Sequence, residues 1–411
     1  MVKIVIVGGG FAGLNAAQAL KKSDVEILLI DRTNHHVFQP LLYQVATAAL
    51  SAENIASPIR EILRKQKNVT VLMANVDKID LQARFIEVGK GEKIPYDYLI
   101  LAPGARHSYF GHDNWEAYAP GLKTIADAVR IHDQILLAFE KAEACGDPTQ
   151  AENEMRFVVI GGGPTGVEMA GSIAEFAHIT LKNNFRHIRP EKAKIFLIEG
   201  TNRLLPAFSQ DLADKANENL KNLGVDVFLT TLVTSIEPHG IWIGDQFLAA
   251  STIIWAAGNQ ASSLLKTIDI PLDKQGRALV EPDLSIPGHP NVFVIGDAAC
   301  SFSAKGIPLP GIAPVAIQQG RYVAKLLQKP GEKRQPFAYF DKGMIATIGR
   351  GKAVAMVGKV KFSGFIAWIA WCFIHIFYLV SFRHRIFVMI QWIFLYFTSR
   401  RQGRVINKGI K

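Results

Sequence analysis

Hydrophobic positions near the start of the chain fall into three blocks, which glycine and polar positions separate. The blocks predict, in order, a strand over 4–7, a helix over 14–20 and a strand over 25–30. A turn with Gly8, Gly10 and Gly13 joins the first strand to the helix, and the second strand ends on Asp31. Short β-branched runs bounded by such turns are typical of buried parallel strands, so we expect a strand–turn–helix–strand unit here.

The glycine spacing adds a candidate chemistry to that unit. The first glycine permits the tight turn, the second lets backbone approach a pyrophosphate, and the third lets the helix pack on the strand. The helix N-terminus then points unpaired N–H groups at the phosphates. Asp31 follows Gly10 by 21 positions, close to the distance of about 20 expected for a carboxylate that binds a ribose 2′-OH. This context favours a dinucleotide site over an ordinary glycine turn and leaves the dinucleotide open.

The same pattern recurs in the middle of the chain. It predicts a strand over 156–160, a helix over 167–176 and a strand over 193–198. The second turn carries Gly161, Gly163 and Gly166, and the closing strand ends on Glu199. Because Glu199 lies 36 positions after Gly163, we expect a helix extension or an insertion of about 15 residues within this unit. Two such fingerprints in one chain predict two dinucleotide sites.

Further elements are predicted between and after these units. They are strands over 69–73, 76–79, 84–88, 98–102, 252–258 and 291–299, and helices over 57–65, 123–144 and 314–327. Ser57 and Pro58 are the expected N-cap and first residue of the first of these helices, and the polar segment 146–154 is an expected linker. Pro314 likewise opens the last helix, whose N-terminal dipole suits negative charge on a bound cofactor. The last strand is expected to return the chain to the first sheet, which makes the second unit an insertion.

Composition narrows the class of protein. With 411 residues the chain is long enough for two or three domains. A content of 49% hydrophobic and 20% charged residues excludes a disordered chain. The three cysteines lie far apart in the sequence, so neither a metal site nor a disulfide framework is expected. The chain opens directly into a strand rather than a basic and apolar signal segment, which predicts a cytosol-facing protein.

The C-terminal part differs from the rest in both charge and hydrophobicity. The chain has a net charge of +10, and residues 331–411 carry 14 Lys and Arg against 2 Asp and Glu, whereas 1–330 is near neutral. The same tail holds two apolar segments, 362–382 with 21 residues and no formal charge, and 386–398. A basic, apolar tail that is rich in tryptophan fits an anionic membrane surface better than nucleic acid.

The two apolar segments are expected to be helices that lie in the membrane interface, with Trp368, Trp371 and Trp392 at headgroup level. The first segment is long enough to span a bilayer, but basic residues flank both of its ends, and the second segment is too short to return. A bilayer span and a buried core or dimer contact remain as alternatives.

Several motifs together resemble those of a known family. General to the two-dinucleotide-binding-domain flavoproteins are GGGFAG at 8–13, GGGPTG at 161–166 and GD at 296–297. Closer to the type II NADH dehydrogenases (NADH:quinone oxidoreductases) are HHVFQPLLYQVAT at 35–47, TGVEMAG at 165–171, LPGIAPVAIQQG at 309–320 and ATIGRGKAVA at 346–355. The resemblance covers essentially the whole chain.

The resemblance implies an α/β fold of two Rossmann-like dinucleotide-binding domains, the second inserted in the first, plus a C-terminal membrane-associated helical segment. The implied domains are an FAD-binding domain over 1–115 and 261–330, an NADH-binding domain over 116–260, and a membrane-anchoring region over 331–411. The implied activity is that of a non-proton-pumping flavoprotein, which passes a hydride from NADH to FAD and then two electrons to a membrane quinone. Such a protein would be a homodimer, peripheral on the cytoplasmic face of the inner (cytoplasmic) membrane, held to an anionic membrane surface and without a nucleic-acid partner.

The resemblance also assigns residues to these roles. FAD contacts are implied for Gly8, Gly10, Phe11, Ala12, Gly13, Asp31, Arg32, Pro40, Thr47, Val76, Ala102, Gly104, Gly296, Asp297 and Ala313. NADH contacts are implied for Gly161, Gly163, Thr165, Gly166, Glu168, Glu199, Ala257 and Gly258. Quinone contacts are implied for Ala316, Gln318 and Gln319, and catalytic roles for Glu168, Gln318 and Gln319.

Some of these positions also have plainer interpretations. Glu168 is either an active-site acid or a carboxylate favoured by a helix N-terminus, and Gln318 and Gln319 are either quinone contacts or helix-surface amides. His375, within the apolar tail, is expected at the membrane interface rather than as a proton donor. Glu199 favours NADH over NADPH because a carboxylate repels a 2′-phosphate.

Three other functions share parts of this pattern. A sulfide:quinone oxidoreductase has the fold and the membrane habit but needs positioned cysteines. A soluble ferredoxin-type or rubredoxin-type reductase has both fingerprints but no reason for the tail, and a non-catalytic redox sensor would bind NADH and dock on membranes. The chain also departs from the family at Pro314, where many members have glutamine, and this removes a side-chain donor near the place where quinone enters.

Overall fold

The computed structural model describes residues 1–407 and divides into two compact units. The first unit comprises Met1–Val37, Ala56–Arg106 and Asn259–Asp341, and the second comprises Phe38–Ile55, His107–Gly258 and Lys342–Lys411. The last four residues of the predicted region 331–411 lie outside the described residues. Each unit therefore combines chain segments that are far apart in the sequence, and the assignment of cofactors to them remains a prediction.

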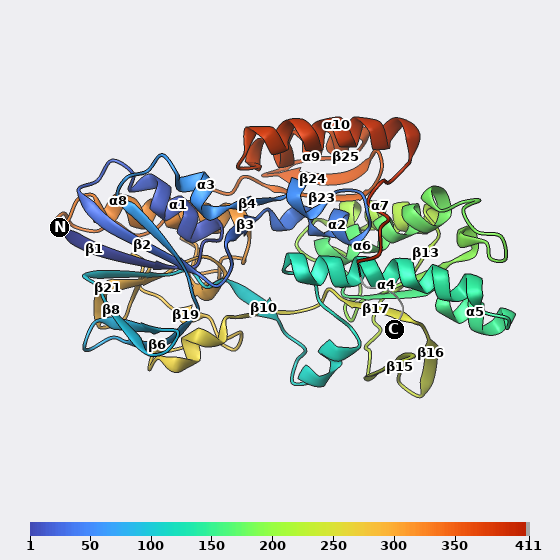
Figure 1. Ribbon diagram of the computed structural model, residues 1–411, viewed down its shortest axis with the longest axis horizontal. Coiled ribbons are helices and arrows are strands. Elements are labelled where there is room, and N and C mark those ends of the chain that lie inside the picture. Colours follow the sequence, from blue (N-terminus) through green and yellow to red (C-terminus); the bar gives the residue numbers. More distant parts are fainter. Residues whose placement is uncertain (408–411) are drawn as a thin grey trace. The chain divides into compact units, whose positions relative to one another are not determined.

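The first unit is built on a six-stranded sheet in the order β20-β21-β9-β1-β2-β5 (Figure 1). Its strands are β1 (Val2–Val7), β2 (Val25–Asp31), β5 (Val69–Met73), β9 (Tyr98–Leu101), β20 (Ser285–Ile286) and β21 (His289–Val294). All of these neighbours run parallel except β20 and β21, and Ile4 of β1 lies opposite Ile27 of β2 and Tyr98 of β9. The near-continuous apolar run of β1 suits a parallel sheet that is covered on both faces.

Helices cover one face of the six-stranded sheet, and a small β-meander covers the other. The other elements of this unit are α1 (Phe11–Ala19), β3 (His35–Val37), β4 (Ala56–Pro58), α3 (Ile59–Leu63), β6 (Val76–Asp80), β7 (Phe85–Val88), β8 (Glu92–Pro95), β18 (Asn259–Ala261), β19 (Ala278–Leu279), β22 (Ala299–Cys300) and α8 (Ala313–Leu327), with β10 (Ala105–His107) at its boundary. On one face α1 and α8 pack together over Ile4 and Ile6, and a Cβ at Gly320 of α8 would overlap the backbone of Ala12. On the other face the sheet β6-β7-β8 buries Val5 and Leu99.

The second unit repeats the parallel plan with four strands in the order β13-β12-β11-β17. Its elements before residue 342 are α2 (Leu42–Ala46), α4 (Ile125–Ala144), α5 (Pro148–Glu154), β11 (Arg156–Ile160), α6 (Pro164–Glu175), β12 (Lys194–Ile198), α7 (Gln210–Asn222), β13 (Val225–Phe228), β14 (Ser235–Glu237), β15 (Gly240–Ile243), β16 (Gln246–Ala249) and β17 (Thr252–Trp255). The extra residues before β12 begin as a π-helical turn over Phe176–Thr180 that continues α6 and end in a 3-10 turn over Pro190–Lys192. The insertion expected from the late position of Glu199 is therefore present.

The C-terminal part of the described chain adds a layer to the second unit. It consists of β23 (Met344–Gly349), β24 (Lys352–Val357), β25 (Val360–Gly364), α9 (Phe365–Tyr378) and α10 (Phe382–Thr398). The three strands form an antiparallel sheet, and β23 packs so closely on α6 that a Cβ at Gly171 would overlap the carbonyl group of Ile348. Small residues Ala353, Ala355 and Ala367 let α9 lie on this sheet, and Figure 1 shows α10 beside α9.

Two local predictions are wrong. The helix expected over 57–65 begins two residues later as α3, because Ser57 and Pro58 belong to β4, where Ser57 pairs with His36. The expected linker over 146–154 contains the helix α5, whose N-cap Asp147 accepts the Thr149 N–H at 2.9 Å.

The apolar tail is divided differently from the expectation. Residues 362–364 belong to β25, and a break after Tyr378 separates α9 from α10. With 14 and 17 residues, these helices are about 21 Å and 26 Å long at about 1.5 Å per residue. No helix among the described residues is long and apolar enough to cross a membrane.

Candidate functional site

The first glycine turn forms a cradle between β1 and α1. A Cβ at Gly8 would overlap the backbone of Ala102, and one at Gly13 would overlap the carbonyl group of Gly8, so glycine is required at both positions. Gly10, by contrast, has open space where a Cβ would lie. It is the N-cap of α1, and no described side chain caps that end. The first N–H groups of α1 are thus left for a ligand, which fits the pyrophosphate of a dinucleotide.

The second turn forms a matching cradle between β11 and α6. Gly161 has φ +112°, and a Cβ there would lie 2.8 Å from the backbone of Ala256. A Cβ at Gly166 would overlap the Gly161 carbonyl group, whereas Gly163 again faces open space. Gly163 is the N-cap of α6, and this end too lacks a side-chain cap among the described residues. The residues present therefore fit a second pyrophosphate.

A carboxylate closes each cradle at the end of the neighbouring strand. Asp31 accepts the Gly9 N–H through Oδ2 at 2.6 Å, and Glu199 accepts the Gly162 N–H through Oε2 at 2.5 Å. In both cases the other oxygen accepts the backbone N–H two residues farther on, at 2.7 Å. Backbone donors thus orient each carboxylate, while its remaining lone pairs are available to ribose hydroxyls. Arg203 donates to the Pro206 carbonyl group at 2.7 Å, within its own loop.

The remaining residues with implied FAD contacts are divided between the units. Phe11, Ala12, Arg32, Val76, Ala102, Gly104, Gly296, Asp297 and Ala313 belong to the first unit, and Pro40 and Thr47 belong to the second. Thr47 is completely buried, and its hydroxyl bonds the Ser172 hydroxyl at 2.7 Å and donates to the Tyr43 carbonyl at 2.8 Å. The Thr47 hydroxyl is therefore engaged within the second unit, and its contact with FAD stays a prediction. Among the implied NADH contacts, Thr165 is exposed in the first turn of α6, and Ala257 and Gly258 follow β17.

The residues on α8 that are predicted to contact quinone have partners within the first unit. Gln319 is 0% exposed, accepts the Gly296 N–H at 2.6 Å and donates to the Ser301 hydroxyl at 2.8 Å. Its contact with a quinone stays a prediction. Gln318 exchanges two hydrogen bonds of 3.0 Å with the backbone of Phe340, and Ala316 is buried beneath Gly296. Gln319 thus holds the backbone at Gly296, next to Asp297, and Gln318 holds the backbone at Phe340. Ala313 is the first residue of α8, and Pro314 follows it.

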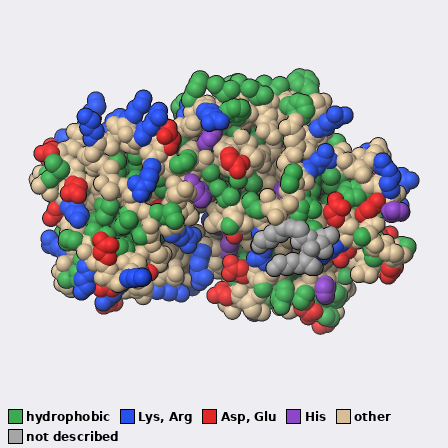
Figure 2. Space-filling view, in the orientation of Figure 1, with side chains coloured by type: hydrophobic (Ala, Val, Ile, Leu, Met, Phe, Trp, Pro, Cys, Tyr) green, Lys and Arg blue, Asp and Glu red, His purple; other side chains and the backbone are tan. Residues whose placement is uncertain are grey.

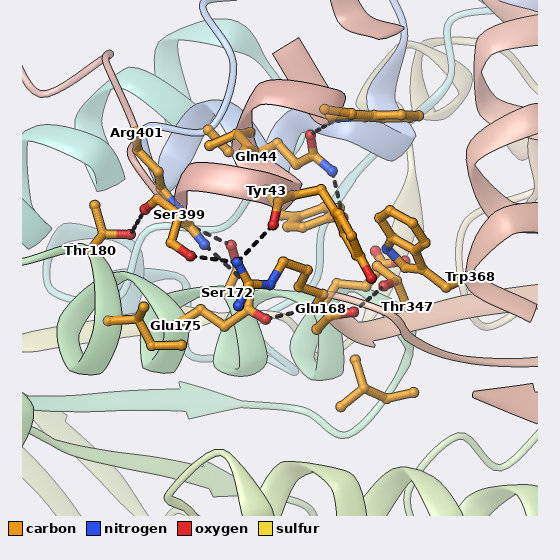
Figure 3. Close-up of a pocket in the computed structure, with 18 of the residues that line it drawn as sticks. Tyr43, Gln44, Glu168, Ser172, Glu175, Thr180, Thr347, Trp368, Ser399 and Arg401 are labelled. Atoms are coloured by element: carbon orange, nitrogen blue, oxygen red, sulfur yellow. Dashed lines mark hydrogen bonds and ion pairs between the residues drawn. The ribbon is translucent and has the colours of Figure 1, made fainter. Parts of the chain in front are cut away.

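A cavity lies in the second unit between α6, α2, β23 and the two C-terminal helices (Figure 3). The cavity has a volume of about 100 Å³. Its polar lining residues are Tyr43, Gln44, Glu168, Ser172, Glu175, Thr180, Thr347, Arg350, Ser399 and Arg401, and its aromatic ones include Trp368, Trp371, Trp392 and Tyr396. A pocket lined by polar and aromatic side chains suits a flat molecule that carries a few polar atoms.

Glu168 is the sequence-predicted residue that this cavity contains. It projects from the second turn of α6, where the backbone of Thr347 hydrogen-bonds to its carboxyl group. Burial raises the pKa of the Glu168 carboxyl to about 8, against a smaller opposite effect of the Thr347 bond. A carboxyl group that stays protonated at neutral pH can deliver a proton, which suits an active-site acid, and this role of Glu168 stays a prediction.

Several residues of this cavity were not predicted from the sequence. Tyr43 and Gln44 lie within the segment 35–47 that the resemblance singled out, but nothing in that segment separated them from their neighbours. Arg401 is 6% exposed and donates to the Thr47 carbonyl at 2.7 Å and the Ser172 hydroxyl at 3.1 Å. It also pairs with Glu175 at 3.5 Å. A single arginine in a basic tail carries no pattern that could have predicted this buried position.

The tail tryptophans are placed differently from the prediction. Trp371 and Trp392 are 2% and 7% exposed, and the Trp392 indole donates to the Gln44 side chain at 2.8 Å. They line the cavity instead of facing outward, so headgroup contact is not available to them. His375 donates through Nδ1 to the Trp371 carbonyl at 2.8 Å, and burial lowers the pKa of His375 to about 4.

The outward faces of α9 and α10 are strongly apolar. The exposed residues there are Phe365, Ile366, Phe373, Ile374, Phe377, Phe382, Ile386, Phe387, Met389, Ile390, Ile393, Phe394 and Phe397. Figure 2 shows hydrophobic side chains gathered along these helices at the edge of the molecule. We call this surface the apolar face. A contiguous exposed patch of this kind marks an interaction surface.

Comparison with known proteins first identifies the broad class of enzyme to which the chain belongs. The sequence profile of the pyridine nucleotide-disulphide oxidoreductases matches residues 2–320, so the chain belongs to that class of flavoenzyme. Its three cysteines, Cys145, Cys300 and Cys372, are all free thiols.

Closer relatives define the family within that class. The chain is 45% identical to the type II NADH:quinone oxidoreductase Ndh of Mycobacterium tuberculosis, over 97% of this chain and 89% of that protein. It is 30% identical to a type II NADH:quinone oxidoreductase of Staphylococcus aureus, over 88% and 91% respectively. Its fold matches NDH2 of Plasmodium falciparum with a TM-score of 0.89 at 23% identity, over 99% and 100%. The chain belongs to the type II NADH:quinone oxidoreductases, and it is an FAD-dependent enzyme that uses NADH.

Proposed function

We propose that the first cradle holds FAD, that the second receives NADH, and that a membrane quinone accepts the electrons at the Glu168 cavity. The observation that carries this proposal is the pair of cradles. Each has two glycines that a Cβ would block, one glycine left open at an uncapped helix end, and a backbone-oriented carboxylate. Two dinucleotides in one chain suit a relay from a reduced nicotinamide through a resident flavin.

The glycine turns and the two carboxylates would bind different parts of FAD and NADH. Gly10 and the first turn of α1 would hold the pyrophosphate of FAD, and Asp31 would bind a ribose hydroxyl. Bound FAD supplies the capacity to take up an electron pair as hydride and to release it to a quinone. Gly163 would likewise help to hold the pyrophosphate of NADH, as Gly10 would for FAD, and Glu199 would bind a ribose hydroxyl of NADH, as Asp31 would for FAD. Two backbone N–H groups hold the Glu199 carboxylate in place. There it would repel the negatively charged 2′-phosphate of NADPH, so Glu199 favours NADH.

Glu168 would serve the second half of the reaction. NADH, one proton and a quinone yield NAD⁺ and a quinol, so the quinone end of the reaction must take up protons. Glu168 holds a proton at neutral pH within reach of the cavity, and the aromatic wall of Trp368 and Trp371 suits the flat ring of a quinone.

The apolar face would bind the membrane. It belongs to the same two helices that cover the cavity, so a long-tailed quinone could pass from lipid to Glu168 without crossing water. Arg383 and Arg385 on α10 would meet anionic headgroups. We place the protein on the cytoplasmic face of the inner membrane, as a homodimer, on the strength of its resemblance to this family.

Purified protein mixed anaerobically with NADH tests the proposal. The yellow absorbance of bound FAD should bleach and return when a short-chain quinone is added. If the absorbance bleaches but does not return, the proposed quinone step is wrong. If it does not bleach, the proposed assignment of the cofactors is wrong. Asp31→Asn should lower FAD retention while Glu199→Gln leaves it intact, because the two carboxylates belong to different cradles.

A further inference from the structure

Two hydrogen-bond donors of the Glu168 cavity have protons that no described residue accepts. Trp371 lines the cavity, and its buried indole nitrogen has no partner among the described residues. The Tyr43 hydroxyl is equally enclosed, since Tyr43 is 6% exposed, and within the described chain it donates no hydrogen bond. A buried donor that lacks an acceptor costs free energy unless a ligand or a water supplies one.

The direction of the Tyr43 hydroxyl follows from a chain of three side chains. An indole N–H can only donate, so the Trp392 bond of 2.8 Å requires the amide oxygen of Gln44 to be its acceptor. The other end of that amide is then its NH₂ group, which must donate to Tyr43 Oη, at 2.8 Å. Tyr43 Oη is therefore an acceptor toward Gln44, and its own proton is available in another direction.

Two carboxyl groups and a thiol act on the Tyr43 hydroxyl. Tyr43 interacts electrostatically with Glu168 of α6, which lines the same cavity, and also with Glu175 and Cys372. Burial and the nearby Glu168 raise the pKa of Tyr43 well above its usual value, so the phenol remains protonated. A protonated phenol and an unpaired indole, set against an aromatic wall, match a flat ring that carries carbonyl oxygens.

We infer that Tyr43 and Trp371 are the hydrogen-bond donors to the carbonyl oxygens of the bound quinone, and that the Trp392–Gln44 pair orients Tyr43 for this purpose. The inference rests on the proposed function of the cavity and assigns the atoms that recognise its substrate. The electron pair comes from NADH. As one carbonyl oxygen becomes a hydroxyl, Tyr43 gives it a proton and takes one from Glu168, which regains a proton from water; the second oxygen is protonated from the proton released on NADH oxidation.

The test separates the two halves of the reaction in the purified, FAD-loaded full-length chain. Tyr43→Phe should leave the rate of NADH bleaching within about twofold. Reoxidation by a short-chain quinone should slow by about 100-fold, the scale seen when one donor to a developing oxyanion is removed. Reduction of ferricyanide, which takes electrons without protons, should be unchanged. Tyr96→Phe is the matched control, because it removes another buried phenol, one that donates to the Asp80 carbonyl at 3.3 Å in the first unit.

A second variant keeps the Tyr43 hydroxyl but directs its proton away from the quinone. In Gln44→Glu the introduced carboxylate has the shape of the amide but only accepts, so it should take the proton of Tyr43. This variant should slow the quinone step as Tyr43→Phe does, and it serves if Tyr43→Phe fails to fold. Trp371→Phe should weaken binding of the same quinone by about tenfold, measured by quenching of tryptophan fluorescence, with NADH bleaching unaffected.

Three results would overturn this inference. A normal quinone step in both Tyr43→Phe and Gln44→Glu, with Glu168→Gln slow, would overturn this inference and leave the cavity as the quinone site. A normal quinone step in all three variants would overturn the inference together with the proposed site. Equal slowing with quinone and with ferricyanide would also overturn it, because a purely structural loss does not distinguish acceptors by their need for protons.

Discussion

Glu168 and Glu199 are carboxylates of the same unit with opposite surroundings. Glu199 accepts two backbone N–H groups at the end of β12, which suits a charged group. Glu168 lies in a cavity whose aromatic wall removes water, and burial raises the pKa of this carboxyl to about 8. The first arrangement suits ribose binding and the second suits proton delivery.

This difference predicts a pH effect on the quinone step. Because the Glu168 carboxyl is protonated below about pH 8, quinone reduction should slow as the pH rises through that value. The other titratable or charged groups that line the cavity are Tyr43, Glu175, Arg350 and Arg401. Glu168→Gln should remove the inflection and lower the rate on its acid side, which stopped-flow reoxidation measures at a series of pH values. An inflection that persists in Glu168→Gln would assign it to another group.

Glu199 predicts a change of coenzyme preference. Glu199→Ser removes the charge that opposes a 2′-phosphate, so kcat/KM for NADPH should rise by about tenfold or more, while that for NADH falls because a ribose bond is lost. Steady-state rates with both coenzymes and one quinone measure this. Unchanged discrimination would show that other groups set the preference. Asp31→Ser, in the other cradle, is the matched control and should not alter the NADH-to-NADPH ratio.

Single residues were predictable to the extent that a spacing rule covers them. The cradle glycines and the two carboxylates follow such a rule, and the structure places them in cradles that fit dinucleotides. Gln319, Trp371 and Arg401 follow none, since whether an amide, an indole or a guanidinium points inward depends on distant chain segments. Their burial became visible only with the tertiary contacts.

At the scale of elements, the glycine turns make a testable pair of positions. Gly166→Ala should destabilise the protein, because its Cβ would overlap the Gly161 carbonyl group where α6 starts against β11. Gly163→Ala should leave the melting temperature nearly unchanged, since open space surrounds that position, yet weaken NADH binding. Thermal unfolding and NADH titration separate the two effects. Equal loss of stability in both variants would contradict the assignment of Gly163 to the ligand.

The helices α9 and α10 predict the mode of membrane contact. Ile390 and Ile393 are 55% and 53% exposed on the apolar face, so Ile390→Glu with Ile393→Glu should weaken binding to anionic vesicles by about tenfold or more. Phe247→Glu, at an exposed position on β16, is the control. Vesicle flotation measures the difference. Undiminished binding of the double variant would remove the apolar face as the anchor, and loss of NADH bleaching would indicate misfolding instead.

Both β–α–β units, α4 and α8 were predictable from apolar periodicity, whereas many short strands, such as β13 to β16, and the helices α2 and α7 were not. Two other differences have local causes. The polar composition of 148–154 hid α5, whose start depends on the Asp147 cap and Pro148. The uniform hydrophobicity of 362–382 hid a strand and a helix end, because a run without polar positions carries no period from which to distinguish them.

At the scale of the whole molecule, each unit gathers segments that are separated by more than a hundred residues. The first unit closes its sheet with β21 and its helical cover with α8, both from the last third of the chain. The insertion was predictable because the strand before Gly296 resembles its predecessors. The membership of 38–55 in the second unit was not, since no boundary signal marks Phe38 or Ile55, and this membership is what brings Tyr43 to Glu168.

The most direct test of the central claim is a single turnover in the absence of oxygen. One equivalent of NADH is mixed with the FAD-loaded protein, and one equivalent of a short-chain quinone follows. We expect that the flavin absorbance bleaches at once and returns fully on addition of quinone, with one quinol formed per NADH. Bleaching that ferricyanide reverses but quinone does not would show that quinone is not the acceptor.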